Sequence, residues 1–136
     1  MSKEDIKTWQ EARRVFDHWS GAAQRPFTDL RQTQLDLAAW QNRNFGAVPP
    51  ELQALGAAEE IGELCHAILK RAQRILGYGD PQVAGPAIAD AIGDALIYLT
   101  NLSTTERLDL LTIYERTAAK VIARDWKAQP ETGGEQ

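Results

Sequence analysis

Two short acidic segments of nearly the same sequence lie inside otherwise apolar stretches of the chain. The first is Glu-Glu-Ile-Gly-Glu at 59–63, and the second is Asp-Ala-Ile-Gly-Asp at 90–94. On a helix, residues three or four positions apart share a face, so each segment presents carboxylates along one side. Carboxylates in apolar surroundings are unfavourable unless they are paired or bound to a cation, and neither segment contains a lysine or arginine. The natural partner of the two acidic faces is therefore a hard divalent metal ion.

The apolar residues recur with the spacing of amphipathic helices, and clusters of glycine and proline separate the helical blocks. We expect helices at about residues 4–19, 28–45, 50–76, 86–102 and 109–126. Thr28 or Asp29 is suited to capping the second helix, and Asp109 to capping the fifth, although Ser103 and Glu106 also have the spacing of a capping box. No block alternates with the period of two that a half-buried strand requires. The fold is therefore expected to be all-α.

The third and fourth blocks are expected to form an antiparallel hairpin. Pro50 suits the first turn of the third block, and the linker 77–85, with three glycines and Pro81, can reverse the chain before the fourth. Antiparallel packing can bring both acidic faces together inside a bundle, as in known carboxylate metal sites. Gly62 and Gly93 are expected to leave room for close backbone approach there, although each costs roughly 1 kcal/mol in helix propensity.

Composition bounds the class of protein. With 136 residues, 43% of them hydrophobic and 25% charged, the chain has the size and composition of one soluble domain. The formal net charge is -4, but without the five acids of the two segments 15 basic residues face 14 acidic ones. No basic stripe suits a nucleic-acid backbone, and no signal peptide or long apolar run indicates a membrane span. We therefore expect neither a nucleic-acid nor a membrane partner. The single cysteine, Cys65, cannot form an internal disulfide, which fits a reducing, cytoplasmic setting.

The acidic segments suit a magnesium ion, or manganese in its place. At about 4 Å and an effective dielectric near 20, two carboxylates repel by roughly 4 kcal/mol, so several together destabilise a fold that has no cation bound. Oxygen ligands with retained water are typical of Mg²⁺ that is bound together with substrate phosphates. Such an ion can polarise a phosphoryl oxygen, activate a water or stabilise the leaving group. A phosphate ester or anhydride is therefore the expected class of substrate.

These motifs resemble those of a known family. The segment 59–63 resembles the EExxE element of the MazG-like all-α nucleoside triphosphate pyrophosphohydrolases, and DAIGDALIYL at 90–99 is similar to the second acidic element of the small, single-domain members. Three further stretches agree, namely WQNRNFG at 40–46, HAILKR at 66–71 and VIARDW at 121–126. The likeness covers about residues 27–126. We expect an N-terminal helical extension at 1–26, a MazG-like domain at 27–129 and a flexible tail at 130–136.

The resemblance implies a MazG-like four-helix bundle, here with an additional N-terminal helix. It also implies an enzyme that uses Mg²⁺ to hydrolyse a nucleoside triphosphate between the α and β phosphates, which releases the monophosphate and pyrophosphate. Deoxynucleotides and non-standard nucleotides are among the candidate substrates. Four or five helices of this length cover their apolar faces poorly alone, so a homodimer or homotetramer is expected.

The resemblance also assigns roles to the acidic residues. The metal ligands that match the family's motif by position are Glu60, Glu63 and Asp94. Glu59 would bind metal as well or orient the attacking water as general base, so that Glu59 and Glu60 are the expected catalytic residues. Many members have a glutamate three residues before the final aspartate, where this chain has Ala91. We assign the missing carboxylate to Asp90.

Basic and aromatic residues are candidates for binding the nucleotide. Lys120 and Arg124 lie one turn apart in the region where the family places residues that contact phosphate, and Lys70 follows the first acidic segment on its helix. Trp40 and Asn44, on one face of the second helix, are candidates for stacking on the base and hydrogen bonding to it. The plainer interpretations are a surface pair near a helix C-terminus for Lys120 and Arg124, and a core position for Trp40.

Two other classes of protein fit parts of the pattern. Glu63 and His66 have the Glu-x-x-His spacing of di-iron carboxylate bundles, which need that motif on two helices. The other histidine, His18, lacks a glutamate three residues before it. A non-catalytic helical interaction module would carry the acidic residues as a solvated face, and they could then be replaced without loss of any activity.

Overall fold

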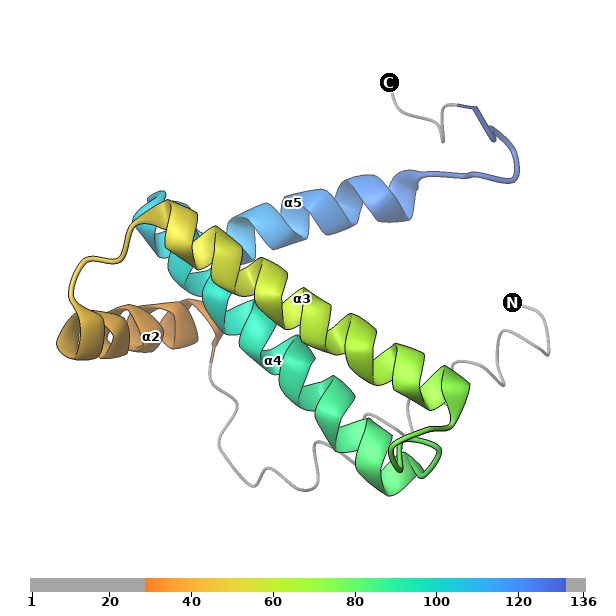
Figure 1. Cartoon of the computed structure of the whole chain (residues 1–136). Coiled ribbons are helices and arrows are strands. Elements are labelled where there is room, and N and C mark those ends of the chain that lie inside the picture. The colour runs from red at the N-terminus through yellow and green to blue at the C-terminus, as the bar shows by residue number, and fades with distance from the viewer. Residues whose placement is uncertain (1–28, 132–136) are drawn as a thin grey trace.

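The computed structural model describes residues 29–131, and this part of the chain forms helices and no strand (Figure 1). In chain order the helices are α2 (Leu30–Phe45), α3 (Pro50–Gln73), α4 (Pro81–Thr105) and α5 (Leu110–Ala123). The expected all-α fold is thereby confirmed for residues 29–131. The expected N-terminal helical extension lies outside the described residues, as does the tail from residue 132 onward.

The helices α3 and α4 run antiparallel and lie side by side along most of their length (Figure 1). Their contact is the most extensive between any two described helices. Pro50 occupies the first turn of α3, as expected, but the helix ends at Gln73, before the expected Leu76. The reason is Arg74, which takes a left-handed φ of 55° and donates its backbone N–H to carbonyls of the last turn. The chain therefore leaves α3 one turn earlier than expected.

The helix α4 begins at Pro81, so the expected start at residue 86 is wrong. The side chain of Asp80 caps the helix by accepting a hydrogen bond from the backbone N–H of Gln82 at 2.8 Å. Pro81 fills the first helical position, where a backbone N–H has no partner within the helix. Pro86 is accommodated inside the helix. The start signal is therefore the Asp-Pro pair, which lies within the segment that the sequence argument assigns to the linker.

Small side chains make the contact between α3 and α4. The buried apolar residues of the described chain are all alanines, namely Ala57, Ala67, Ala84, Ala91 and Ala95. Interaxial distance depends on the side chains at the contact, so alanines allow a close approach. The approach is tightest at Gly56, where an added Cβ would overlap the ring of Tyr98. An added Cβ at Gly62 or Gly93 would meet no atom within 4 Å, so the expectation of close backbone approach at these two glycines is wrong.

The helix α2 is joined to the rest of the molecule near its N-terminal end. Gln34 donates from Nε2 to the hydroxyl of Thr104 at 3.1 Å and to the carbonyl of Leu108 at 2.8 Å. Its Oε1 accepts a hydrogen bond from the backbone N–H of Leu110 at 3.0 Å. One side chain of α2 thus holds the end of α4, the connection that follows it and the start of α5.

Asp109 caps α5, as the sequence predicts. Its carboxylate accepts hydrogen bonds from the backbone N–H of Thr112 at 3.0 Å and from Nε of Arg31 at 2.7 Å. The hydrogen bond from Arg31 is the main reason why the pKa of Asp109 lies below its ordinary value. From this start α5 packs against α2 and α4, and none of its residues is buried.

Large apolar side chains remain exposed on every described helix. Neither α2 nor α5 has a buried residue, and Ile122 of α5 is 83% exposed. The exposed apolar side chains in the middle of the hairpin include Ile61, Ile68, Ile92, Leu96 and Leu99. Contiguous apolar surface of this kind is typical of a surface that contacts something else. The described chain alone therefore leaves the apolar faces of its helices largely uncovered.

By length and hydropathy, α4 is the one helix of residues 29–131 that could cross a membrane. Asp90 and Asp94 lie near the middle of this helix. An aspartate at the centre of an inserted helix costs roughly 2.5–3.5 kcal/mol, so two of them oppose insertion. We therefore treat α4 as a bundle helix, and the cytoplasmic location stays a prediction.

The contact at Gly56 can be tested by substitution. Gly56→Ala is expected to lower the free energy of unfolding, because overpacking costs about 1–3 kcal/mol while the gain in helix propensity is only about 1 kcal/mol. Gly93→Ala is the matched control and is expected to raise the free energy of unfolding by up to about 1 kcal/mol, since its methyl group meets open space. Urea denaturation measures both. Equal effects of the two substitutions would contradict the tight contact with Tyr98.

Candidate functional site

The acidic residues come from the two helices of the hairpin. Those on α3 are Glu59, Glu60 and Glu63, and those on α4 are Asp90 and Asp94. The residues sort into two cavities, each lined by carboxylates of both helices. Glu59 and Glu63 line the first cavity together with Asp90, and Glu60 lines the second together with Asp94. The hairpin thus brings the two acidic segments together.

The electrostatic surroundings of Glu60 show how close the segments are. The pKa of Glu60 is raised above its ordinary value, first because the side chain is partly removed from water. Repulsion raises it further, from Glu63, Asp94, Glu59 and Asp90 in that order. Within residues 29–131, no cation contributes to the shift. The other four carboxylates therefore all act on Glu60, and we call the five residues together the acidic cluster.

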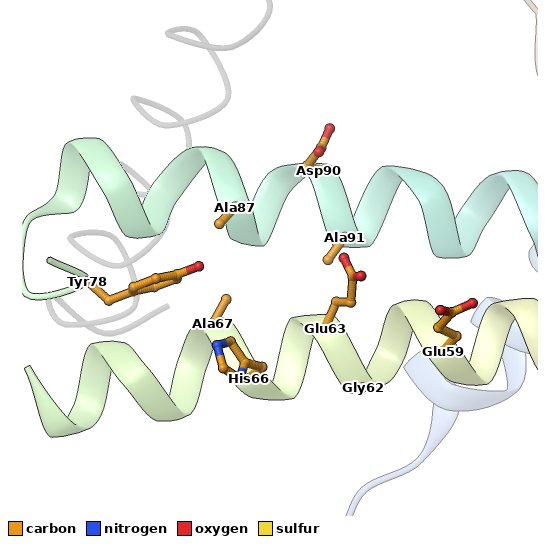
Figure 2. Close-up of a pocket in the computed structure, with 9 residues that line it drawn as sticks. All are labelled: Glu59, Gly62, Glu63, His66, Ala67, Tyr78, Ala87, Asp90 and Ala91. Carbon is orange, nitrogen blue, oxygen red and sulfur yellow. The ribbon is translucent and has the colours of Figure 1, made fainter. Parts of the chain in front are cut away.

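The first cavity has a volume of about 590 Å³ and runs along the hairpin (Figure 2). Glu63 points toward Ala91 of the facing helix, whereas Asp90 points away from α3 in this view. Nearer the chain reversal, the rings of His66 and Tyr78 meet edge-on with their centroids 6.2 Å apart. The cavity is acidic at one end and aromatic at the other.

The acidic cluster has the donor set of a hard divalent cation, because all of its ligand atoms would be carboxylate oxygens. Among the described residues, no three such side chains already converge on one point, and Asp90 would have to rotate toward α3 to share an ion. Glu60 and Asp94 are half-buried, but Glu59, Glu63 and Asp90 are exposed rather than enclosed in a bundle. The reason is that α3 packs against α4 alone among the described helices.

The second cavity has a volume of about 740 Å³ and lies between α2 and the hairpin. Its apolar lining consists of Trp40, Phe45, Val48, Leu52, Ile97 and Tyr98. Its polar lining consists of Glu60, Asp94 and the amides of Gln41, Gln53 and Asn101. The rings of Trp40 and Phe45 meet edge-on with their centroids 5.5 Å apart. A flat, apolar group could therefore bind here beside two carboxylates of the acidic cluster.

Of the residues expected to bind the base, only one lines a cavity. Trp40 lines the second cavity and is 42% exposed. Asn44 lines neither cavity, because its Nδ2 donates a hydrogen bond to the carbonyl of Trp40 on the same helix at 2.8 Å. Asn44 is thus bonded within its own helix, and its role in binding the base stays a prediction.

The residues expected to bind phosphate line neither cavity. Lys120 and Arg124 lie at the end of α5, a helix that packs against α2 and α4 but not against α3. The guanidinium of Arg124 lies 5.6 Å from the ring centroid of Trp126. Lys70 donates from Nζ to Oε1 of Gln73 at 3.4 Å on its own helix. Within one chain the structure does not bring these cations to the acidic cluster.

The sequence argument missed the amides of the second cavity, although the sequence contains a signal for them. Gln53 lies seven residues before Glu60 on α3, and Asn101 lies seven residues after Asp94 on α4. Seven residues are two helical turns, so each amide shares a face with a carboxylate of the acidic cluster. Tyr98, one turn after Asp94, follows the same rule. Searching the carboxylate faces for polar and aromatic residues would have found all three.

Comparison with known proteins leaves the family open. No family model matches the chain, and neither the curated proteins nor the solved structures include a match. The resemblance to the MazG-like family therefore rests on the sequence of the two acidic segments and on the shorter stretches that accompany them.

A metal-binding experiment tests the acidic cluster. The pKa of Glu60 is raised in the folded state, so the ionised form of this side chain is less favourable there than in the unfolded chain. The free energy of unfolding therefore falls as the pH rises through the raised pKa. Without divalent ions at neutral pH, Glu60→Gln is therefore expected to have a higher free energy of unfolding than the parent protein. Added Mg²⁺ is expected to stabilise the parent protein more than the variant, because an ion that binds the folded state raises its stability by mass action.

Thermal unfolding in EDTA and in Mg²⁺ measures both effects. Glu51→Gln is the control, since Glu51 is an exposed residue in the first turn of the same helix and lines neither cavity. This variant is expected to respond to Mg²⁺ as the parent protein does. A parent protein whose unfolding temperature is the same in EDTA and in Mg²⁺ would contradict the metal site.

Proposed function

We propose that the protein is a Mg²⁺-dependent nucleoside triphosphate pyrophosphohydrolase of the MazG-like type. The observation that carries the proposal is the acidic cluster, in which carboxylates from two antiparallel helices raise the pKa of Glu60 and no cation of residues 29–131 opposes them. A divalent ion with a bound triphosphate would relieve that repulsion. The aromatic wall of the second cavity lies beside the same carboxylates and suits the base of the nucleotide. The products would be a nucleoside monophosphate and pyrophosphate.

The acidic residues divide into ligands and a base. Glu60, Glu63 and Asp94 would hold the ion, and Asp90 would join them after rotation of its side chain. A divalent ion bound there, Mg²⁺ or Mn²⁺, would supply Lewis acidity and neutralise phosphate charge. The exposed carboxylate of Glu59 would accept the proton of the water that attacks the α-phosphorus. The bond from the α-phosphorus to the α,β-bridging oxygen then breaks, and pyrophosphate leaves with that oxygen.

The second cavity would position the base. Trp40, Phe45 and Tyr98 provide aromatic surface, and a base gains most by stacking on such rings in an offset or edge-on arrangement. Glu60 and Asp94 line the same cavity, so a base bound there places its phosphates toward the acidic cluster. This arrangement replaces the expected pair of Trp40 and Asn44, since Asn44 is engaged on its own helix.

We also propose that the protein is a homodimer or homotetramer in the cytoplasm. The exposed apolar side chains on the hairpin and on α5 support this proposal, because a second copy would remove them from water. The basic residues Lys120 and Arg124 lie on α5, which makes no packing contact with α3 of its own chain. In an oligomer they could reach the phosphates at the acidic cluster of another copy.

Sedimentation equilibrium tests the oligomer. The expected mass at micromolar concentration is twice or four times that of the chain. Leu96→Glu, which places a charge on an apolar side chain that is 56% exposed, is expected to shift the equilibrium toward the monomer. Gln82→Glu, an exposed position in the first turn of the same helix, is the control and is expected to keep the parent mass. A monomeric parent protein would overturn this part of the proposal.

The activity is tested by incubating the purified protein with Mg²⁺ and a panel of ribonucleoside and deoxyribonucleoside triphosphates. Pyrophosphate and the monophosphate are expected in equal amounts. Glu59→Gln is expected to lower turnover roughly 10²–10⁴-fold, the range for loss of a general base. Glu60→Gln is expected to abolish turnover while the protein stays folded, and Glu51→Gln is expected to keep full turnover.

Other outcomes would identify the alternatives. Release of single phosphates would indicate a different phosphohydrolase reaction. No product from any nucleotide would favour the helical interaction module, which the exposed apolar side chains also suit. Stoichiometric iron in the purified protein would indicate a di-iron carboxylate protein instead.

A further inference from the structure

Two buried amide side chains in the second cavity have acceptor atoms without partners. Gln53 is 2% exposed and Asn101 is 4% exposed, and both line the cavity. Among the described residues, neither Oε1 of Gln53 nor Oδ1 of Asn101 has a hydrogen-bond partner. Buried polar atoms are nearly always paired, so two such oxygens in one cavity require an explanation.

The Gln53 amide is hydrogen-bonded to a neighbouring amide. Its Nε2 donates a hydrogen bond to Oε1 of Gln41 at 3.1 Å, across the gap between α3 and α2. That bond uses one N–H of the amide, and the oxygen of Gln53 is left without a partner among the described residues. An amide oxygen only accepts hydrogen bonds, so the partner that is missing must be a donor.

The other lining residues of the second cavity indicate what kind of ligand would carry this donor. Its wall contains the rings of Trp40, Phe45 and Tyr98, and it also contains the carboxylates of Glu60 and Asp94. A ligand that fits has a flat apolar body, N–H groups on its edge and a phosphate tail that shares a cation with the carboxylates. A nucleotide whose base presents N–H donors to the two amide oxygens has all three features.

We propose that Gln53 and Asn101 select nucleotides whose base carries an exocyclic amino group. The amino groups of cytosine, adenine and guanine are donors, and each offers two N–H bonds, enough for two acceptors. Uracil, thymine and hypoxanthine have a carbonyl oxygen where cytosine or adenine has its amino group, and that oxygen would face the amide oxygens as a second acceptor. A site built around buried hydrogen-bonding groups discriminates strongly against a ligand that leaves them unpaired. This inference rests on the proposed function and names its substrate class.

The test compares bases that differ only in this group. Triphosphates with an α,β-imido link resist cleavage between those phosphates, so their binding can be measured by calorimetry in Mg²⁺ without hydrolysis. The deoxycytidine analogue is expected to bind at least about tenfold more tightly than the deoxyuridine analogue, and the deoxyadenosine analogue at least about tenfold more tightly than the deoxyinosine analogue. Equal affinities within each pair, a preference for the carbonyl base or no binding of any analogue would overturn the inference.

Substitutions then assign the preference to the two amides. Asn101→Leu and Gln53→Leu keep roughly the size of the side chain and remove its acceptor, and each is expected to reduce the preference to less than about threefold. The controls Asn42→Leu and Gln73→Leu make the same changes at exposed positions outside both cavities and are expected to keep the parent preference. A preference that survives in folded Asn101→Leu and Gln53→Leu proteins would overturn the assignment. The comparison of bases on the parent protein decides the inference even where a variant fails to fold.

This experiment separates the inference from the proposed function. A preference for amino bases without release of pyrophosphate from any triphosphate would support the inference and overturn the hydrolase. Pyrophosphate release at equal rates from amino and carbonyl bases, together with equal affinities, would support the hydrolase and overturn the inference. A buried water that satisfies both oxygens predicts the second result.

Discussion

The close approach of α3 and α4 through alanine side chains is the constraint on which the rest of the structure depends. The helices could not lie so near each other if larger residues stood at positions such as Ala91 and Ala95. Asp90 and Asp94 each directly precede one of these two alanines in the sequence. The short distance between the helices therefore also brings these carboxylates near those of α3. The alanine contact between α3 and α4 therefore affects both the stability of the hairpin and the electrostatic potential at the acidic cluster.

The alanine contact also limits how much apolar surface the described chain can bury. An alanine contact removes little apolar area from water, and the larger side chains, such as Ile92 and Leu99, point elsewhere and stay exposed. The same folded segment thus carries unrelieved repulsion on its acidic side and uncovered apolar surface on other sides. A bound cation would relieve the first and an apolar partner surface the second, as in the function that we propose.

The sequence predicts those features that depend on local pattern. Helical spacing predicts the all-α fold, Asp109 predicts the start of α5, and the repeated acidic segments predict a hairpin that brings them together. Features that depend on packing between distant segments were not predictable in the same way. The tight contact falls at Gly56 rather than at Gly62 or Gly93, because the position of Tyr98 on the facing helix decides it. The direction of α5 depends likewise on interactions across the fold, and the sequence pattern of that helix does not specify it.

The polar links of α2 are unevenly distributed along the helix. Gln34, near its N-terminal end, makes three hydrogen bonds to the α4–α5 connection and its flanks, whereas Gln41 provides one link to α3. The N-terminal end of α2 is therefore held by more side-chain hydrogen bonds than the end that carries Trp40 and Phe45, where one amide pair joins α2 to α3 among the described residues. Widening the second cavity at this end would break the hydrogen bond between Gln41 and Gln53 and leave the three bonds of Gln34 in place.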